Sequence, residues 1–113
     1  MGRRQMNLLQ GTLDVLVLKA LAGTSRHGYG VAEWIRATTS GTFEVEDGAL
    51  YTSLHRMEKR QWLRATWGVS ENNRRAKYYA LTDAGRAELG KATTDWGRYA
   101  EAVFKVLDSG QEG

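Results

Sequence analysis

The chain has 113 residues, of which 42% are hydrophobic and 26% charged, the size and composition of one globular domain. Its net charge of +3 is too small to identify an acidic partner by itself. The absence of cysteine excludes disulfides, thiol catalysis and cysteine-ligated zinc, and no apolar run approaches the roughly 20 residues that cross a bilayer. Residues 1–9 lack the apolar run of a secretory signal, so we expect a cytoplasmic protein.

The first 40 residues predict two helices. Residues 12–22 form the first, with Thr12 as its cap and Asp14 at the positive end of the helix dipole. Its apolar residues occupy more than one face, and Val15 and Leu18 lie off the main stripe, so this helix needs a second packing partner. A turn at residues 23–26 leads to the second helix at residues 29–38, which ends at Ser40 and Gly41.

A third helix is predicted at residues 48–61, capped by Asp47. At 100° per residue, one face of this helix points to the core and carries Leu50, Leu54, Met57 and Gln61. The opposite face has no acid and carries Gly48, Thr52, His55, Arg56 and Lys59. Such groups suit phosphate oxygens and the base edges of a DNA major groove, although surface helices are often basic without function. Tyr51 lies at the flank, where it either reaches a phosphate or seals the core.

From Leu63 the pattern alternates, which predicts a hairpin with strands at residues 63–69 and 75–81 and a tip at residues 71–73. The adjacent Tyr78 and Tyr79 leave the facing of its second strand open. The positive charge of the chain is concentrated here, since residues 51–80 hold seven basic side chains and two acidic ones. Arg74, Arg75 and Lys77 near the tip are candidates for contact with a DNA backbone or minor groove, as are Arg3 and Arg4.

A last helix is predicted from Thr82 and Asp83 to Leu107, longer than a small domain can cover. Its apolar residues follow a 3, 4, 3, 4, 3 spacing, an interface pattern formed by Leu89, Ala92, Trp96, Tyr99, Val103 and Val106. We expect these residues, with Val15 and Leu18, to form a homodimer interface; packing on the same domain is the alternative. Trp96 and Tyr99 are also candidates for stacking on a small aromatic effector.

The order of three helices, a basic hairpin and a helix predicts a mainly α fold with a small β-hairpin (α+β), of the winged helix-turn-helix type. We expect a DNA-binding domain at residues 1–81, a dimerisation helix at 82–108 and a disordered tail at 109–113. Any small α+β domain could share this order, and a winged helix can instead bind protein or RNA. An enzyme is not expected, because His27 and His55 have no acid at ligand spacing, and no cofactor or metal is implied. His27 is interpreted as a phosphate contact or a solvated turn residue.

Three motifs resemble the PadR family of transcriptional regulators. They are GALYTSLHRME at residues 48–58, HGYG at 27–30 and KYYALTDAG at 77–85, and the resemblance spans about residues 8–107. Family members usually have proline at the position of Thr52 and glycine at that of Gln61, so the chain departs from the pattern there. The single C-terminal helix resembles the short-tailed branch of the family.

The resemblance implies a homodimer that binds a palindromic operator, usually as a repressor. It also implies DNA contacts by the residues that match the family's reading positions, namely Tyr29, Tyr51, Thr52, His55 and Arg56. The positions of Leu50, Leu54, Leu81 and Gly85 match framework positions of the family.

Overall fold

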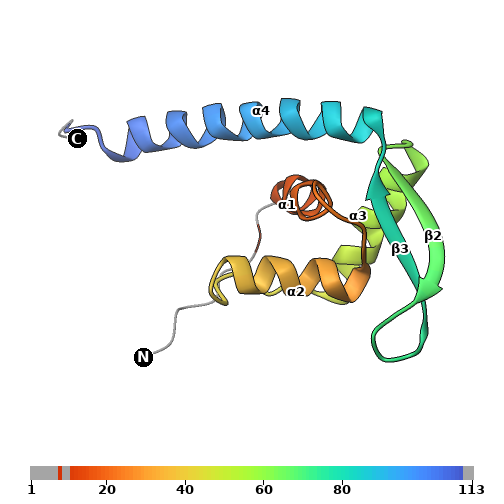
Figure 1. The fold of residues 1–113 in the computed structure, drawn as a ribbon. Helices are drawn as coiled ribbons and strands as arrows, with labels where there is room; N and C mark the ends of the chain where they lie inside the picture. The colour runs from red at the N-terminus through yellow and green to blue at the C-terminus, as the bar shows by residue number, and fades with distance from the viewer. Residues whose placement is uncertain (1–7, 9–10, 111–113) are drawn as a thin grey trace.

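The structure is a computed structural model that describes residue 8 and residues 11–110. Its elements are α1 (Thr12–Ala20), β1 (Arg26–His27), α2 (Gly28–Thr38), α3 (Asp47–Lys59), β2 (Leu63–Val69), β3 (Arg75–Leu81) and α4 (Asp83–Leu107). Figure 1 shows α1, α2 and α3 gathered beside the β2–β3 hairpin, with α4 crossing over α1 and continuing beyond the other helices. The predicted order of helices and hairpin, a winged helix-turn-helix arrangement with a long last helix, is confirmed.

Two helix starts differ from the prediction. The residue that precedes α1 is Gly11, at φ 88°, and Thr12 is the first helical residue rather than the cap. The Thr12 hydroxyl instead accepts a hydrogen bond from Trp96 Nε1 at 3.1 Å, so it ties α1 to α4. The α3 helix begins at Asp47 after Glu46, and neither side chain caps it. Asp47 still places negative charge in the first turn, where the helix dipole favours it.

The sheet has three antiparallel strands in the order β1-β3-β2. The hairpin matches the predicted strands, and Asn73 at φ 59° helps to turn the chain at its tip. The strand β1 was not predicted, because two residues are too few to show an alternating pattern; Arg26 and His27 pair with Tyr79 and Tyr78. The turn predicted at residues 23–26 therefore leads into β1, which is an edge strand of the sheet.

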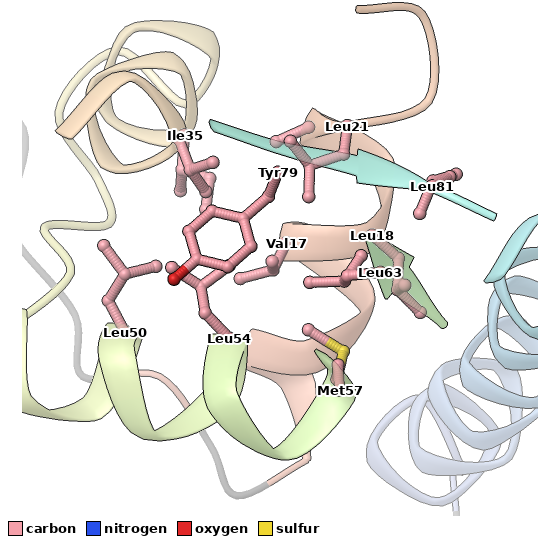
Figure 2. Close-up of a cluster of buried hydrophobic side chains, with 12 residues drawn as sticks. Val17, Leu18, Leu21, Ile35, Leu50, Leu54, Met57, Leu63, Tyr79 and Leu81 are labelled. Atoms are coloured by element: carbon pink, nitrogen blue, oxygen red, sulfur yellow. The ribbon is translucent and has the colours of Figure 1, made fainter. Parts of the chain in front are cut away.

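The core lies between the first three helices and the inner face of the hairpin (Figure 2). Its buried side chains are Val17, Leu18, Ala20, Leu21, Val31, Ile35, Leu50, Leu54, Met57, Leu63, Tyr79 and Leu81. In Figure 2, Tyr79 extends from β3 toward Leu50 and Leu54, which settles the facing of that strand. Burial raises the pKa of the Tyr79 phenol.

Two residues do not lie where the sequence placed them. Leu18 is 1% exposed and belongs to the core of its own chain, because α4 packs on α1 and supplies the second partner that this helix needs. Gln61, expected in the core, is exposed because α3 ends at Lys59. Gln61 has φ 65°, and the hydrogen bonds from Gln61 N to Glu58 O and from Trp62 N to Met57 O close the helix in a Schellman motif.

The α4 helix is anchored at its start. The Thr82 hydroxyl accepts a hydrogen bond from Gly85 N at 3.0 Å, and a Cβ on Gly85 would lie 2.1 Å from the Trp62 carbonyl oxygen. Leu89, predicted at a dimer interface, packs against the core of its own chain. Across the described part of the chain, no helix is long and apolar enough to cross a membrane.

Candidate nucleic-acid interface

The outward face of α3 is accessible along most of its length. Burial of Leu50, Leu54 and Met57 fixes the rotation of the helix about its axis. As a result Thr52, His55 and Lys59 lie on the exposed side, as the helical spacing predicted. A hydroxyl, an imidazole and an ammonium group therefore face away from the core, and the helix can enter a groove of duplex DNA with them.

Arg56, unlike the other polar residues of this face, is bound to an acidic side chain of another helix. Its Nη2 atom donates hydrogen bonds to both carboxylate oxygens of Asp14, at 2.5 and 2.6 Å, and Ser53 Oγ donates to the same carboxylate at 2.6 Å. The outward face of α3 itself carries no acid, as expected, but folding brings Asp14 of α1 against its edge. The Arg56 side chain remains 41% exposed.

The cationic side chains of the hairpin differ in their surroundings. Arg74 and Arg75 are exposed, and the Arg75 guanidinium carbon lies 4.5 Å from the centroid of the Trp67 ring, in a cation–π contact. Lys77 instead forms an ion pair with Glu58 of α3, with Nζ and Oε1 3.2 Å apart, and the hydrogen bond to Glu58 raises the Lys77 pKa. Lys77 thus connects the hairpin to α3.

A groove of about 410 Å³ separates the hairpin from the start of α2 and the flank of α3. It is lined by aromatic and basic side chains, among them Tyr29, Tyr51, His55, Trp67, Arg74, Arg75 and Lys77. Tyr29 is 70% exposed, and Tyr51 is exposed at its flank. The structure thus brings all the DNA-contact candidates of α2, α3 and the hairpin to this groove, except Thr52, Arg56 and Lys59, which lie on α3 outside its lining.

The position of Tyr51 depends on a glycine. A Cβ on Gly28 would lie 2.5 Å from the Tyr51 hydroxyl oxygen and 2.7 Å from the ring carbon that carries it. Glycine at the start of α2 therefore lets the phenol of α3 lie directly against that backbone. Tyr51 lies against the start of α2 and keeps an exposed surface in the groove, and its contact with a phosphate stays a prediction.

His27 has two structural contacts that the sequence did not predict. Its Nδ1 accepts a hydrogen bond from Gly30 N at 2.9 Å and caps α2, while its Nε2 lies 3.5 Å from Glu71 Oε1 at the hairpin tip. The interpretation of His27 as a solvated turn residue was wrong. The HGYG segment instead joins the start of α2 to the hairpin.

Trp67 is the groove residue that sequence reasoning missed. Trp67 and Val69 alternate with the buried Leu63 along β2 and so share its side of the strand, but they are 59% and 66% exposed. The reason is that the hairpin extends past the core, so its apolar face continues without cover. The sequence signal that could have identified Trp67 as a groove residue is its position near the tip of a hairpin rich in basic residues.

A second groove, of about 570 Å³, runs between α1 and α4. Val15, Leu18, Trp96 and Tyr99 contribute to its lining, together with both acidic and basic residues. Beyond it, α4 exposes large apolar side chains that no described residue covers, namely Val103, Phe104, Val106 and Leu107. The half of the helix that lies beyond the other elements in Figure 1 is thus apolar on an open side.

Residue 8 and residues 11–110 contain no cluster of three or more histidine, aspartate or glutamate side chains that could hold a metal ion. The basic arm of Arg3 and Arg4 lies outside the described residues.

Comparison with known proteins places the chain among DNA-binding regulators. Residues 17–91 match the sequence profile of the Transcriptional regulator PadR-like family. A PadR-like transcriptional regulator from Bacillus cereus superposes with a TM-score of 0.74 at 26% identity, over 89% of this chain and 96% of that one. A PadR family regulator from Eggerthella lenta gives a TM-score of 0.75 at 27% identity, over 88% and 85%.

Among curated sequences, an uncharacterised protein of Lysinibacillus sphaericus is 27% identical over 90% of this chain and 94% of its own length. A probable transcriptional regulator of Mycobacterium tuberculosis is 29% identical over 66% of this chain, but the match covers only 40% of that protein. With two thirds of its length matched by the family profile and its winged helix shared with solved members, the chain belongs to the PadR-like family of transcriptional regulators.

Proposed function

We propose that the protein is a sequence-specific repressor that binds a palindromic operator as a homodimer, through α3 and the basic hairpin of each subunit. The observation that carries the proposal is the groove between α3, the start of α2 and the hairpin. It combines exposed phenols, an imidazole and two arginines, the groups that contact phosphates and base edges.

Each part of this surface has its own task in the proposal. Thr52 and His55 of α3 read base edges in the major groove, and Lys59 contacts a phosphate. Tyr29 and Tyr51 contact the backbone beside them. Arg74 and Arg75 follow the backbone or the minor groove, where Trp67 adds an apolar contact with the sugars.

The homodimer is supported by the uncovered apolar side of α4. Trp96, Tyr99, Val103 and Val106 lie on one stripe, and all four are exposed in a single chain. A second α4 packed along this stripe, and against Val15 at the neighbouring groove, covers them. Two subunits would then present two α3 helices to half-sites about one helical turn apart.

The groove between α1 and α4 is also the place for an effector. Trp96 and Tyr99 provide flat aromatic surfaces there, and a planar aromatic molecule can stack on them beside the proposed dimer interface. Because Trp96 also donates a hydrogen bond to Thr12, a bound molecule would contact the helix pair that sets the position of α4.

The test is selection of duplexes from a random DNA library, followed by titration of the selected duplex at several salt concentrations. We expect an inverted repeat and a steep loss of affinity with salt. His55→Ala should weaken binding to the selected duplex, whereas Lys105→Ala, at the far end of α4, should not. Failure to enrich any duplex, or preference for RNA, would instead favour a winged helix used for RNA or protein contact.

A further inference from the structure

We infer that Asp14 is a positioning residue for DNA recognition, which holds the Arg56 guanidinium in the orientation that meets the duplex. The inference rests on the proposed function and adds to it a residue on α1, outside the DNA-contact surface. It also gives a role to an acid of α1 that contacts Arg56 at the edge of the outward side of α3.

The geometry of the contact fixes one edge of the guanidinium. Both carboxylate oxygens of Asp14 accept from the same nitrogen, Nη2 of Arg56, which is a bifurcated contact made by one of its two hydrogens. Ser53, which is 2% exposed, donates to the same carboxylate and fixes its rotation. The carboxylate is therefore oriented by one residue of α3 and in turn orients another, one helical turn away.

The second hydrogen of Nη2 and the other N–H groups of the guanidinium remain available, which leaves one fork free. Nε and Nη1 of Arg56 form no hydrogen bond within residues 11–110, and the side chain is 41% exposed. An arginine can present a planar fork of N–H groups to a phosphate or to a guanine. Because Asp14 already restricts the rotamers of Arg56, less conformational entropy is lost when the free edge binds DNA.

Simple electrostatics instead predicts that Asp14 weakens the binding of DNA. A carboxylate close to the DNA surface repels phosphates, so its removal alone should strengthen binding to every duplex. Positioning instead requires Asp14 for the discrimination between operator and other sequences. The sign of the change in operator affinity when Asp14 is neutralised therefore separates the two roles.

The experiment compares the wild type with Asp14→Asn in titrations against the selected operator and a random duplex at matched salt. We expect Asp14→Asn to lower the ratio of operator to random affinity by about tenfold, within the range for contacting pairs, with random affinity unchanged or increased. In an Arg56→Ala background, the same substitution should change the ratio by less than about twofold. Glu33→Gln, which breaks the exposed pair with Arg36 on α2, is the matched control and should leave the ratio unchanged.

An Asp14→Asn protein that binds the operator more tightly, with the discrimination ratio intact, would overturn the inference. Circular dichroism establishes that each variant is folded. If Asp14→Asn does not fold, Arg56→Lys provides the test, because it keeps the charge and loses the fork; discrimination equal to that of the wild type would again overturn the inference. If the wild type enriches no duplex at all, the proposed function fails instead, so the two failures are distinguishable.

Discussion

The two free arginines at the hairpin tip allow a quantitative prediction. Neither Arg74 nor Arg75 has a carboxylate partner among the ion pairs of residues 11–110, whereas Lys77 is paired with Glu58. Each phosphate contact contributes about 0.9 to the slope of log affinity against log salt. If both arginines contact phosphates in each subunit of a dimer, Arg74→Ala with Arg75→Ala should reduce the slope by about 3 to 4. Between 50 and 200 mM salt the variant should then lose about a hundredfold less affinity than the wild type.

Fluorescence anisotropy with the selected operator at four salt concentrations measures these slopes. Lys77→Ala is the control, because it removes a charge from the same strand but one that is already compensated in the free protein. We expect its slope to stay within about 1 of the wild-type value. Equal slopes for the wild type and the double variant would refute phosphate contact by the hairpin tip, and a slope reduced equally by Lys77→Ala would refute the distinction between free and paired cations.

Three further predictions concern stability and assembly. Gln61→Gly should stabilise the fold by about 0.5–1 kcal/mol in chemical denaturation, because it relieves a positive φ, while Gln61→Ala keeps the Cβ and should show no such gain. Gly85→Ala should cost about 3 kcal/mol or more, since its Cβ would meet the Trp62 carbonyl oxygen at 2.1 Å; an unchanged midpoint of thermal unfolding would contradict that packing. Trp96→Asp should give monomers by light scattering, whereas Thr12→Val, which removes only the hydrogen bond between α1 and α4, should remain dimeric.

Local signals explain why most of the fold could be predicted. The alternation that starts at Leu63 and the cap formed by Thr82 each depend on neighbouring residues, so the hairpin and α4 start where the sequence indicated. The buried face of α3 followed from helical spacing alone. The end of α3 was wrong by two residues because Gln61 occupies a left-handed position that glycine usually fills. Glycine at the matching position in family members is the signal that pointed to this turn.

Contacts between distant parts of the chain could not be predicted in the same way. Asp14 precedes Arg56 by 42 residues, and nothing in their local sequence pairs them. The contact of His27 with Glu71 spans 44 residues and depends on β1, which is too short to be recognised from alternation. The sequence predicted no enzyme because His27 and His55 have no acid at ligand spacing, and membership of a family of transcriptional regulators confirms that prediction.

These contacts change how the basic block at residues 51–80 should be understood. It holds seven basic side chains, but folding pairs Arg56 with Asp14 and Lys77 with Glu58, and Arg60 lies over the Trp62 ring. Of these seven side chains, Lys59, Arg60, Arg64, Arg74 and Arg75 form no ion pair among the described residues, and three of the five lie on the hairpin. In the proposed complex, the long-range attraction comes mainly from the hairpin. Thr52 and His55 of α3 discriminate between sequences, together with Arg56, whose orientation Asp14 fixes before DNA binds. Different substitutions should therefore alter affinity and specificity, because the residues responsible for affinity lie on the hairpin and those responsible for specificity lie on α3.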